Sequence, residues 1–304
     1  MPSAIDLSLD AVIAAVTDGQ PRLLTVSVPD RAPSLPSGPL DTDTDATLEI
    51  GLRRWVHEQT GLDLGYVEQL YTFGDRDRYR TADSVRHLSI AYLALVREGQ
   101  PSGSAEWHNW YELLPWEDRR GGEPAVIVNR IVPHLRKWSA KDADRTGRVQ
   151  VTFGLDGVPW DPIRTLDRYE LLYEADLVAE AYRDRIDSPP PEGTVGIEMN
   201  HDHRRIIATA IGRLRGKLTY RPVVFEVMSE TFTLSGLQRT VESLIGVRVH
   251  KQNFRRLVER GNLVEGTRMH AASTGGRPAE LFRFRREVVS ERPRPGVGLP
   301  RPRR

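Results

Sequence analysis

One short segment of the chain, HKQNFRRLVERG, carries side chains that suit the recognition of DNA bases. Arg255 and Arg256 can each donate two parallel hydrogen bonds to guanine, and Gln252 and Asn253 can pair with adenine in the same bidentate way. Lys251 is better placed to bind a phosphate. The alternative interpretation is a solvated charged face, which is the commoner outcome for an isolated basic helix.

These side chains can act together only if the segment is a helix with one apolar face. Phe254, Leu257 and Val258 stand at helical spacing and predict its buried face, and Gly261 is expected to end the helix. The polar side chains named above then lie opposite that face or beside it.

A first helix is predicted just before this one, over SGLQRTVESLIG. Ser235 and Gln238 have capping-box spacing at its start, and Gly246 is expected to end it. Its apolar residues follow helical spacing: Leu237, Val241, Leu244 and Ile245. Two short amphipathic helices joined by a tight turn indicate a helix-turn-helix.

Two predicted strands, LVEGT and ELFRF, follow the second helix around a glycine-bearing loop. This hairpin is expected to be a wing that carries Arg268, His270 and Arg277. The order of helix, turn, helix and hairpin, with basic residues throughout, predicts a winged helix-turn-helix that binds double-stranded DNA.

The charge of the chain divides at about residue 200. The whole chain of 304 residues has a net charge of +1, but residues 201–304 have a balance of +13 and residues 1–200 one of −12. This division predicts an effector-sensing domain over 1–200, a DNA-binding domain over 201–289 with a leading linker helix, and a disordered basic tail over 290–304.

The composition excludes several classes of protein. There is no cysteine, so disulfides, thiolate metal sites and cysteine nucleophiles are excluded. No apolar stretch reaches the length of a membrane span, and the N-terminus lacks the pattern of a signal peptide. We therefore expect a cytoplasmic protein with no membrane partner.

The first half of the chain shows mixed strand and helix patterns. Two strands are expected around a DGQP turn within 10–28, then a helix over TLEIGLRRWVHEQTG that Gly61 ends, then the strands YVEQLYTF and HLSIAYLALV. One long helix is predicted over 166–184, and another begins at Asp202 as its cap.

These segments resemble a Nudix domain, a mixed sheet sandwiched between helices, and the expected fold class is therefore α+β or α/β. Together with NHDHRRIIATAIGRLRGKLTYRPVVFEVM and the winged helix, the chain is similar to the Nudix-related transcriptional regulators of bacterial NAD metabolism. The resemblance is greatest to the NadQ type of alphaproteobacteria and more distant to the NrtR type. It covers residues 8–115 and 196–286, and leaves about 117–196 as an extra or inserted segment that could cover an effector site or form a dimer interface.

The Nudix box of this chain departs from the family pattern. Aligned on Gly61, it keeps a few positions, namely Arg54, Val56, Glu58 and Leu62. Trp55 and Gln59 stand where two metal-binding glutamates belong, the upstream glutamate position falls on Ala46, and the box glycine is displaced to Gly38. Nudix hydrolysis needs Mg²⁺ held by several carboxylates, so the resemblance implies no catalytic residue and no metal site.

The resemblance implies that the domain still binds an effector nucleotide, such as NAD, ATP or ADP-ribose, with no obligatory cofactor. The candidate contacts are Arg54, Glu58, Tyr71, Phe73, Arg76 and Arg78. Arginines could pair with phosphates and aromatic rings could stack on adenine. Alternatively, Arg54 and Glu58 form only an intrahelical ion pair, and Tyr71 and Phe73 are core residues of a strand.

Three functions follow from these observations. The first is a dimeric repressor of NAD-biosynthesis or salvage genes, bound to a palindromic operator and controlled by a nucleotide. The second is an active Nudix-type ADP-ribose or NADH diphosphatase with an appended DNA-binding domain. The third, an RNA-binding interaction protein, is the weakest because no exposed aromatic platform is evident.

Overall fold

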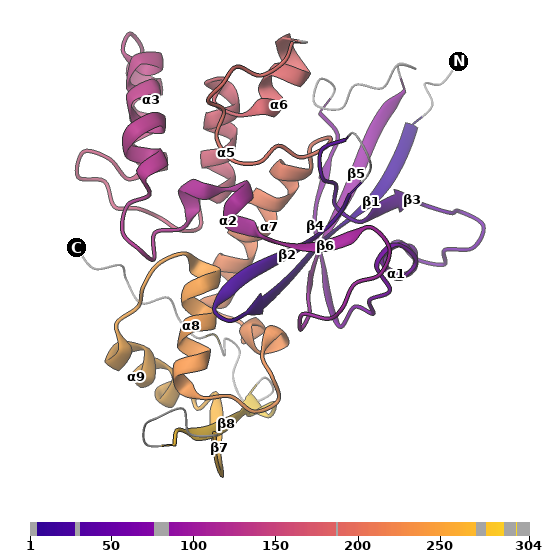
Figure 1. Ribbon diagram of the computed structural model, residues 1–304, viewed down its shortest axis with the longest axis vertical. Coiled ribbons are helices and arrows are strands. Elements are labelled where there is room, and N and C mark those ends of the chain that lie inside the picture. Colours follow the sequence, from indigo (N-terminus) through magenta and orange to yellow (C-terminus); the bar gives the residue numbers. More distant parts are fainter. Residues whose placement is uncertain are drawn as a thin grey trace.

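A mixed sheet forms the centre of the N-terminal part in the computed structural model, which describes residues 5–27, 31–75, 85–186, 188–271, 278–288 and 296 (Figure 1). Its strands are β1 (Ile5–Thr17), β2 (Gln20–Val26), β3 (Ser37–Pro39), β4 (Tyr66–Phe73), β5 (Arg86–Leu95) and β6 (Ala105–Asn109). Their order is β4-β5-β1-β2-β6, with β3 on the first half of β1. β1 and β5 are parallel, and the other pairs are antiparallel.

The tight turn predicted between the first two strands is confirmed. Asp18 and Gly19 have φ angles of 52° and 70°. Two residues with positive φ are what a two-residue hairpin requires, because that turn matches the right-handed twist of the strands. The β1–β2 hairpin then reaches toward the C-terminal part of the chain, where it contacts α8.

Helices cover both faces of the sheet, as expected. On one face lies α1 (Leu48–Thr60), which Thr47 caps by accepting a hydrogen bond from the Ile50 amide and which Gly61 ends at φ 69°. Leu52 and Val56 of this helix are fully buried against the sheet.

The other face is covered by α7 (His203–Leu218), which contacts β1, β4 and β5. Asp202 stands at the N-cap position as predicted, but its carboxylate binds Arg205 instead of capping an amide. The predicted division at residue 200 assigns α7 to the DNA-binding domain, whereas in the structure this helix is packed on the sheet as well.

A helical segment lies between β6 and α7. It contains α2 (Trp110–Leu113), η1 (Pro115–Glu117), η2 (Ile127–Ile131), α3 (Val132–Ser139), α4 (Ala143–Phe153), α5 (Thr165–Glu174), α6 (Ala179–Ala181) and η3 (Tyr182–Ile186). The single helix expected over 166–184 is wrong. It is broken after Glu174, since Asp176 has φ 57° and Val178 is extended.

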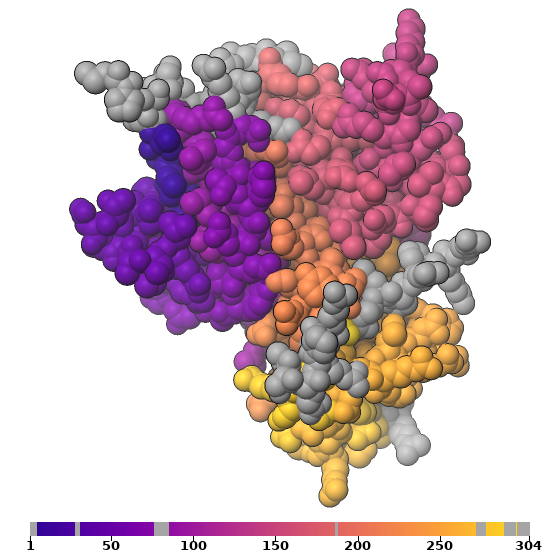
Figure 2. All heavy atoms as spheres, turned by 180° about the vertical axis from the view of Figure 1, so that it is seen from behind, coloured from indigo at the N-terminus to yellow at the C-terminus, as the bar shows by residue number. Residues whose placement is uncertain are grey.

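The C-terminal part has the predicted order of helix, turn, helix and hairpin. It contains η4 (Val223–Val227), α8 (Leu234–Ile245), α9 (Lys251–Gly261), β7 (Val264–His270) and β8 (Glu280–Phe284). Figure 2 shows it as a lobe at one end of the molecule, with α7 running toward it between the sheet and the helical segment. Among the described helices, none combines the length and apolar character that crossing a bilayer requires.

Two predicted helix ends in this part are wrong in detail: the capping box of Ser235 and Gln238 at the start of α8, and Gly261 at the end of α9. Thr233 caps α8, because its hydroxyl accepts from the Gly236 amide at 3.0 Å. The side chain of Gln238 instead bonds Glu242 and the Val249 carbonyl, so no capping box forms. Asn262, with φ 49°, ends α9 in place of Gly261.

One hydrophobic core joins these parts. Residues from the α7 face of the sheet, the helical segment and the winged helix belong to a single buried cluster, including Leu93, Tyr169, Ile211 and Leu237. The C-terminal helix-turn-helix and hairpin are therefore packed onto the body of the protein, and their position depends on that packing.

Candidate functional site

The polar face of α9 is fully available to a partner. Phe254 and Val258 are buried, as expected, while Leu257 is half-buried. The five predicted DNA contacts on the helix are all exposed: Lys251, Gln252, Asn253, Arg255 and Arg256. Within the described part of the chain they form no hydrogen bond or ion pair, so their donors are free to bind bases and phosphates.

The beginning of α9 is open as well. His250 occupies the N-cap position without a side-chain hydrogen bond to the first turn. The amide groups of that turn are therefore left for an external acceptor, and a helix N-terminus suits a phosphate oxygen by both geometry and dipole.

The turn between α8 and α9 is held by a buried carboxylate. Glu242 is 3% exposed and accepts a hydrogen bond from the Val249 amide at 3.0 Å and from the Arg248 guanidinium at 2.8 Å. Gly246 lies in the turn with φ 75°. These contacts fix the angle at which α9 leaves α8.

The two predicted strands of the wing form a hairpin ladder with an irregular stretch in β7. β7 and β8 are antiparallel, and their register shifts between Gly266 and His270. Arg268 sits in this irregular stretch with φ 63°, and its side chain, like that of His270, is exposed. Arg277, the other predicted wing contact, lies outside the described residues.

The surface of α1 does not offer a cluster of carboxylates. The indole of Trp55 donates a hydrogen bond to the Pro39 carbonyl at 2.7 Å and lies so close to Gly38 that a Cβ there would be 2.2 Å from the ring. The Gln59 amide bonds both the carbonyl and the amide of Ser37. These two residues attach α1 to β3 at the positions where a Nudix hydrolase would hold metal.

Arg54 and Glu58, the charged residues that α1 keeps from the family pattern, are engaged in ion pairs. Arg54 donates to Asp45 from Nε and Nη2, at 3.1 and 2.8 Å, and lies 3.5 Å from Glu58. The hydrogen bond from Arg54 lowers the pKa of Asp45, so this carboxylate stays charged. Among the described residues, no group of three or more acidic or histidine side chains could hold a metal ion.

The predicted effector contacts are divided between the two faces of the sheet. Arg54 and Glu58 lie on α1, whose buried side belongs to one core cluster, whereas Phe73 is buried in the other cluster, beneath α7. Tyr71 is 61% exposed, and its ring lies edge to face against that of Phe73, with 5.4 Å between the ring centroids. Arg76 and Arg78 lie outside the described residues. Among the described candidates, the structure therefore separates Arg54 and Glu58 from Tyr71 and Phe73.

A polar pocket, here called the α7 pocket, lies on the face covered by α7. It is lined by Asp10, Phe73, His87, Ser89, His201 and His203, together with Asp75 and Asp202. Its volume is about 20 Å³, so in this form it admits little more than a water molecule.

Hydrogen bonds fix the buried groups of this pocket. The Leu35 amide donates to Nδ1 of His203 at 3.0 Å, so the proton of the neutral ring is on Nε2, which lies 3.4 Å from Asp10. Burial alone would raise the pKa of Asp10, but the hydrogen bonds from His203 and Ser89 lower it. Burial and the neighbouring His203 and Arg183 lower the pKa of His201 to about 3.

Sequence reasoning did not single out this pocket. Asp10, Ser89 and His203 come from three distant segments and meet only through the parallel β1–β5 pairing and the packing of α7. The available signal was the pair of histidines on either side of the helix-starting Asp202.

Comparison with known proteins gives matches over the C-terminal part and over nearly the whole chain. Residues 224–284 match the NrtR DNA-binding winged helix domain. The chain is 22% identical over 282 residues to the ADPR-responsive transcriptional repressor NtrR of Acinetobacter baylyi, covering 91% of this chain and 81% of that protein.

Two solved structures share the fold. NrtR of Shewanella oneidensis, solved in complex with a 27-mer DNA, superposes with a TM-score of 0.57 at 22% identity over 93% of this chain and 95% of that chain. A MutT/nudix family protein from Enterococcus faecalis superposes with a TM-score of 0.54 at 16% identity over 94% and 88%. The chain thus has a Nudix-like body followed by a winged helix domain.

Proposed function

We infer from these matches that the chain is an NrtR-type, Nudix-related transcriptional regulator, and we propose that it is a DNA-binding repressor controlled by a nucleotide. One observation carries the proposal: the winged helix presents an unpaired row of arginine, glutamine and asparagine side chains on α9, and this is the set that major-groove recognition uses. The wing adds Arg268, and we propose Arg277 as a further contact. A basic C-terminal part on an acidic body fits the same function.

We propose a homodimer on a palindromic operator. A single α9 covers only a few base pairs, and regulators of this kind gain affinity by placing two recognition helices about 34–36 Å apart, one turn of the duplex. In vitro selection from random duplexes tests this directly. A two-fold symmetric consensus with half-sites one turn apart supports the proposal. If the selected duplexes share no consensus sequence, the proposal is contradicted.

We propose ADP-ribose as the effector, because the Acinetobacter baylyi relative is an ADPR-responsive repressor. NAD and ATP are the alternatives. The α7 pocket is the proposed place for the nucleoside: the Phe73 ring can stack on a base, and carboxylates such as Asp10 can accept hydrogen bonds from ribose hydroxyls or an exocyclic amine. Its narrow form implies that binding moves the side chains that line it.

Arg54 and Glu58 are proposed only as an outlying part of the effector site, since Arg54 is already paired with Asp45 and Glu58. Tyr71, next to Phe73 and largely exposed, is closer to the proposed pocket. Arg76 and Arg78 remain proposed phosphate contacts. Thermal-shift measurements with ADP-ribose, NAD, NADH, ATP and nicotinic acid mononucleotide rank these ligands by the rise in melting temperature that each causes. If none of them raises the melting temperature, an effector of this class is contradicted.

We also propose that the Nudix-like body does not hydrolyse diphosphates. Trp55 and Gln59 attach α1 to β3 where metal-binding glutamates would stand, and Glu58 alone cannot hold Mg²⁺ against a diphosphate. The test is phosphate release from ADP-ribose with Mg²⁺ or Mn²⁺. Turnover in the ordinary enzymatic range of ~1–10³ s⁻¹ would overturn this proposal.

The proposed function as a whole is tested by fluorescence anisotropy with the selected operator duplex. We expect tight binding to the operator, weak binding to a scrambled duplex, and a change in operator affinity when ADP-ribose is added. As the resemblance implies, the proposed targets are genes of NAD biosynthesis or salvage. Equal affinity for both duplexes would reject a sequence-specific regulator.

A further inference from the structure

The two ends of α7 lie in different functional regions of the molecule. His203 at its N-terminal end lines the α7 pocket, while Arg215, near its C-terminal end, reaches the helix-turn-helix. The rise of an α-helix places these two residues about 18 Å apart. The helix therefore spans the distance between the proposed nucleotide site and the DNA-binding unit.

The C-terminal end of α8 is held by donors that lie outside the winged helix. The carbonyl of Ser243 accepts a hydrogen bond from the Tyr111 hydroxyl at 2.6 Å, and that of Leu244 accepts one from Nε of Arg215 at 3.0 Å. The Arg119 amide donates to the Gly246 carbonyl at 2.7 Å. We call these three donors the α8 socket. They satisfy carbonyl groups that a helix end leaves unpaired.

The socket permits little freedom at this junction. Gly246 lies so close to the body that a Cβ there would be 2.3 Å from the Glu117 carbonyl. The guanidinium of Arg215 also suits the negative end of the α8 dipole. Any displacement of Arg215 must therefore either break these bonds or carry α8 with it.

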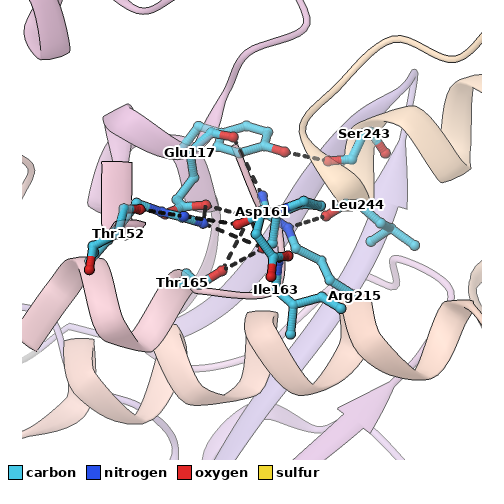
Figure 3. Close-up of polar contacts among 11 residues, drawn as sticks. Glu117, Thr152, Asp161, Ile163, Thr165, Arg215, Ser243 and Leu244 are labelled. Carbon is cyan, nitrogen blue, oxygen red and sulfur yellow. Dashed lines mark hydrogen bonds and ion pairs between the residues drawn. The ribbon is translucent and has the colours of Figure 1, made fainter. Parts of the chain in front are cut away.

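A buried charge cluster fixes Arg215 itself, as Figure 3 shows. Its guanidinium forms an ion pair with Glu117 and bonds the Pro162 carbonyl and the Thr165 hydroxyl. Glu117 is paired in turn with Arg168, and the three charged side chains are 0% exposed. Burial alone would raise the pKa of Glu117, but the two arginines lower it, so the carboxylate is charged.

The N-terminal end of α7 is fixed by groups that a ligand in the α7 pocket would contact or border. His203 bonds Asp10 and the Leu35 amide, and the next residue, Arg204, is buried against Glu180. Arg204 also donates to the Leu113 carbonyl of α2 at 3.3 Å. Because Tyr111 belongs to the same α2, this short helix touches both the start of α7 and the end of α8.

We infer that α7 transmits nucleotide binding at its His203 end to the helix-turn-helix, and that the α8 socket, through Arg215 and Tyr111, positions the recognition helix. The inference rests on the proposed function and adds the route by which it works. A ligand that enters the narrow pocket displaces His201 and His203, α7 moves as a unit, and Arg215 transfers that movement to α8.

The test weakens the socket, or the support of its member Arg215, without removing a charge or a ring. Tyr111→Phe deletes the hydroxyl that holds Ser243, and Thr165→Val deletes one partner of Arg215 while keeping the shape of the side chain. Tyr173→Phe is the matched control, since its hydroxyl bonds Asp184 in the helical segment. For each protein, operator affinity is measured by anisotropy with and without saturating ADP-ribose, and ADP-ribose affinity is measured by calorimetry.

In the unaltered protein we expect ADP-ribose to change the operator Kd by a factor within the usual range of about 5–150-fold. In Tyr111→Phe and Thr165→Val we expect that factor to fall at least threefold toward 1, while ADP-ribose affinity stays within twofold. Tyr173→Phe should keep the full factor. A general loss of structure would instead weaken the affinities for both the operator and ADP-ribose. The change in operator Kd caused by ADP-ribose therefore distinguishes a loss of coupling from a loss of folding.

Hydrogen exchange on the unaltered protein provides a second measurement that needs no variant. ADP-ribose should change the exchange of amides in α7 and at the C-terminal end of α8. Unchanged exchange in α8, or a full coupling factor in both Tyr111→Phe and Thr165→Val, overturns the inference while the proposed function stands. If ADP-ribose does not bind the unaltered protein or does not change its operator affinity, the proposed effector response itself is rejected, and this inference with it.

Discussion

Arg215 on α7 donates a hydrogen bond from its Nε to the backbone carbonyl of Leu244, the penultimate residue of α8, over 3.0 Å. Both residues are buried, and the body of the protein thereby holds the first helix of the DNA-binding pair directly. The cation at this junction is tolerated because Glu117 neutralises it. The stability of the junction therefore depends on one carboxylate.

Replacing Glu117 with alanine should destabilise the protein strongly. The change leaves Arg168 and Arg215 buried without a counter-ion, which typically costs about 3–5 kcal/mol. Urea unfolding followed by circular dichroism measures the loss. The control is Glu49→Ala, because Glu49 forms only an exposed i,i+4 pair with Arg53 worth about 0.3–0.5 kcal/mol. Similar losses in both variants would show that the buried cluster contributes no more than a surface pair.

His201 should make the protein less stable in acid. Burial, with His203 and Arg183 nearby, lowers its pKa in the folded chain from 6.5 to about 3. Between these values the unfolded chain binds a proton that the folded chain does not. Above about pH 6.5, His201 therefore does not reduce the free energy of unfolding. Below that pH the free energy of unfolding falls as the pH decreases toward 3.

The variant His201→Asn should remove this acid sensitivity. Residue 201 has φ 48°, a conformation that asparagine tolerates well. Between pH 6.5 and 4 the free energy of unfolding of the variant should fall less steeply than that of the parent. The difference is at most about 1.4 kcal/mol per pH unit, and smaller because part of the ring contacts solvent. Parallel stability curves for the two proteins would mean that the folded protein binds this proton normally.

Local signals were sufficient for much of the fold. Asp18 and Gly19 specify their turn by backbone preference, Gly61 ends α1, and Phe254 and Val258 give α9 its buried face, all within a few residues of sequence. Each of these features depends on neighbours along the chain. That is why periodicity and turn chemistry were enough to predict them.

Features that depend on distant partners could not be predicted in the same way. The helix expected over 166–184 is interrupted after Glu174, and the Leu177 carbonyl pairs with the distant Val195 amide, a contact that no local pattern encodes. Glu117, Arg168 and Arg215 look like surface residues in sequence, since charged residues are seldom fully buried. Their burial follows only from meeting one another.

The two basic side chains on α9 should differ in what they contribute to DNA binding. Arg256→Ala should cost about 1–3 kcal/mol on the operator and relax base preference at one position, because a bidentate contact to a base is lost. Lys251→Ala should weaken operator and scrambled duplexes alike and reduce the salt dependence of binding. Anisotropy titrations at several salt concentrations measure both. Equal loss of specificity in the two variants would contradict this division.

Arg268 allows stability and DNA binding to be separated in the wing. Its φ of 63° costs an ordinary side chain about 1 kcal/mol, and glycine adopts this conformation freely. Arg268→Gly should therefore melt no lower than the parent, since relief of strain offsets the greater freedom of glycine in the unfolded chain.

The same substitution removes an exposed cation from strand β7 of the wing. Operator affinity should therefore decrease, and the slope of log affinity against log salt should become shallower by about 1 if the guanidinium neutralises a phosphate. Arg283→Gly is a useful comparison, because Arg283 pairs with Glu265 across β7 and β8 and its loss should lower the melting temperature. An Arg268→Gly protein that binds the operator as tightly as the parent, with the same salt slope, would show that Arg268 does not contact DNA.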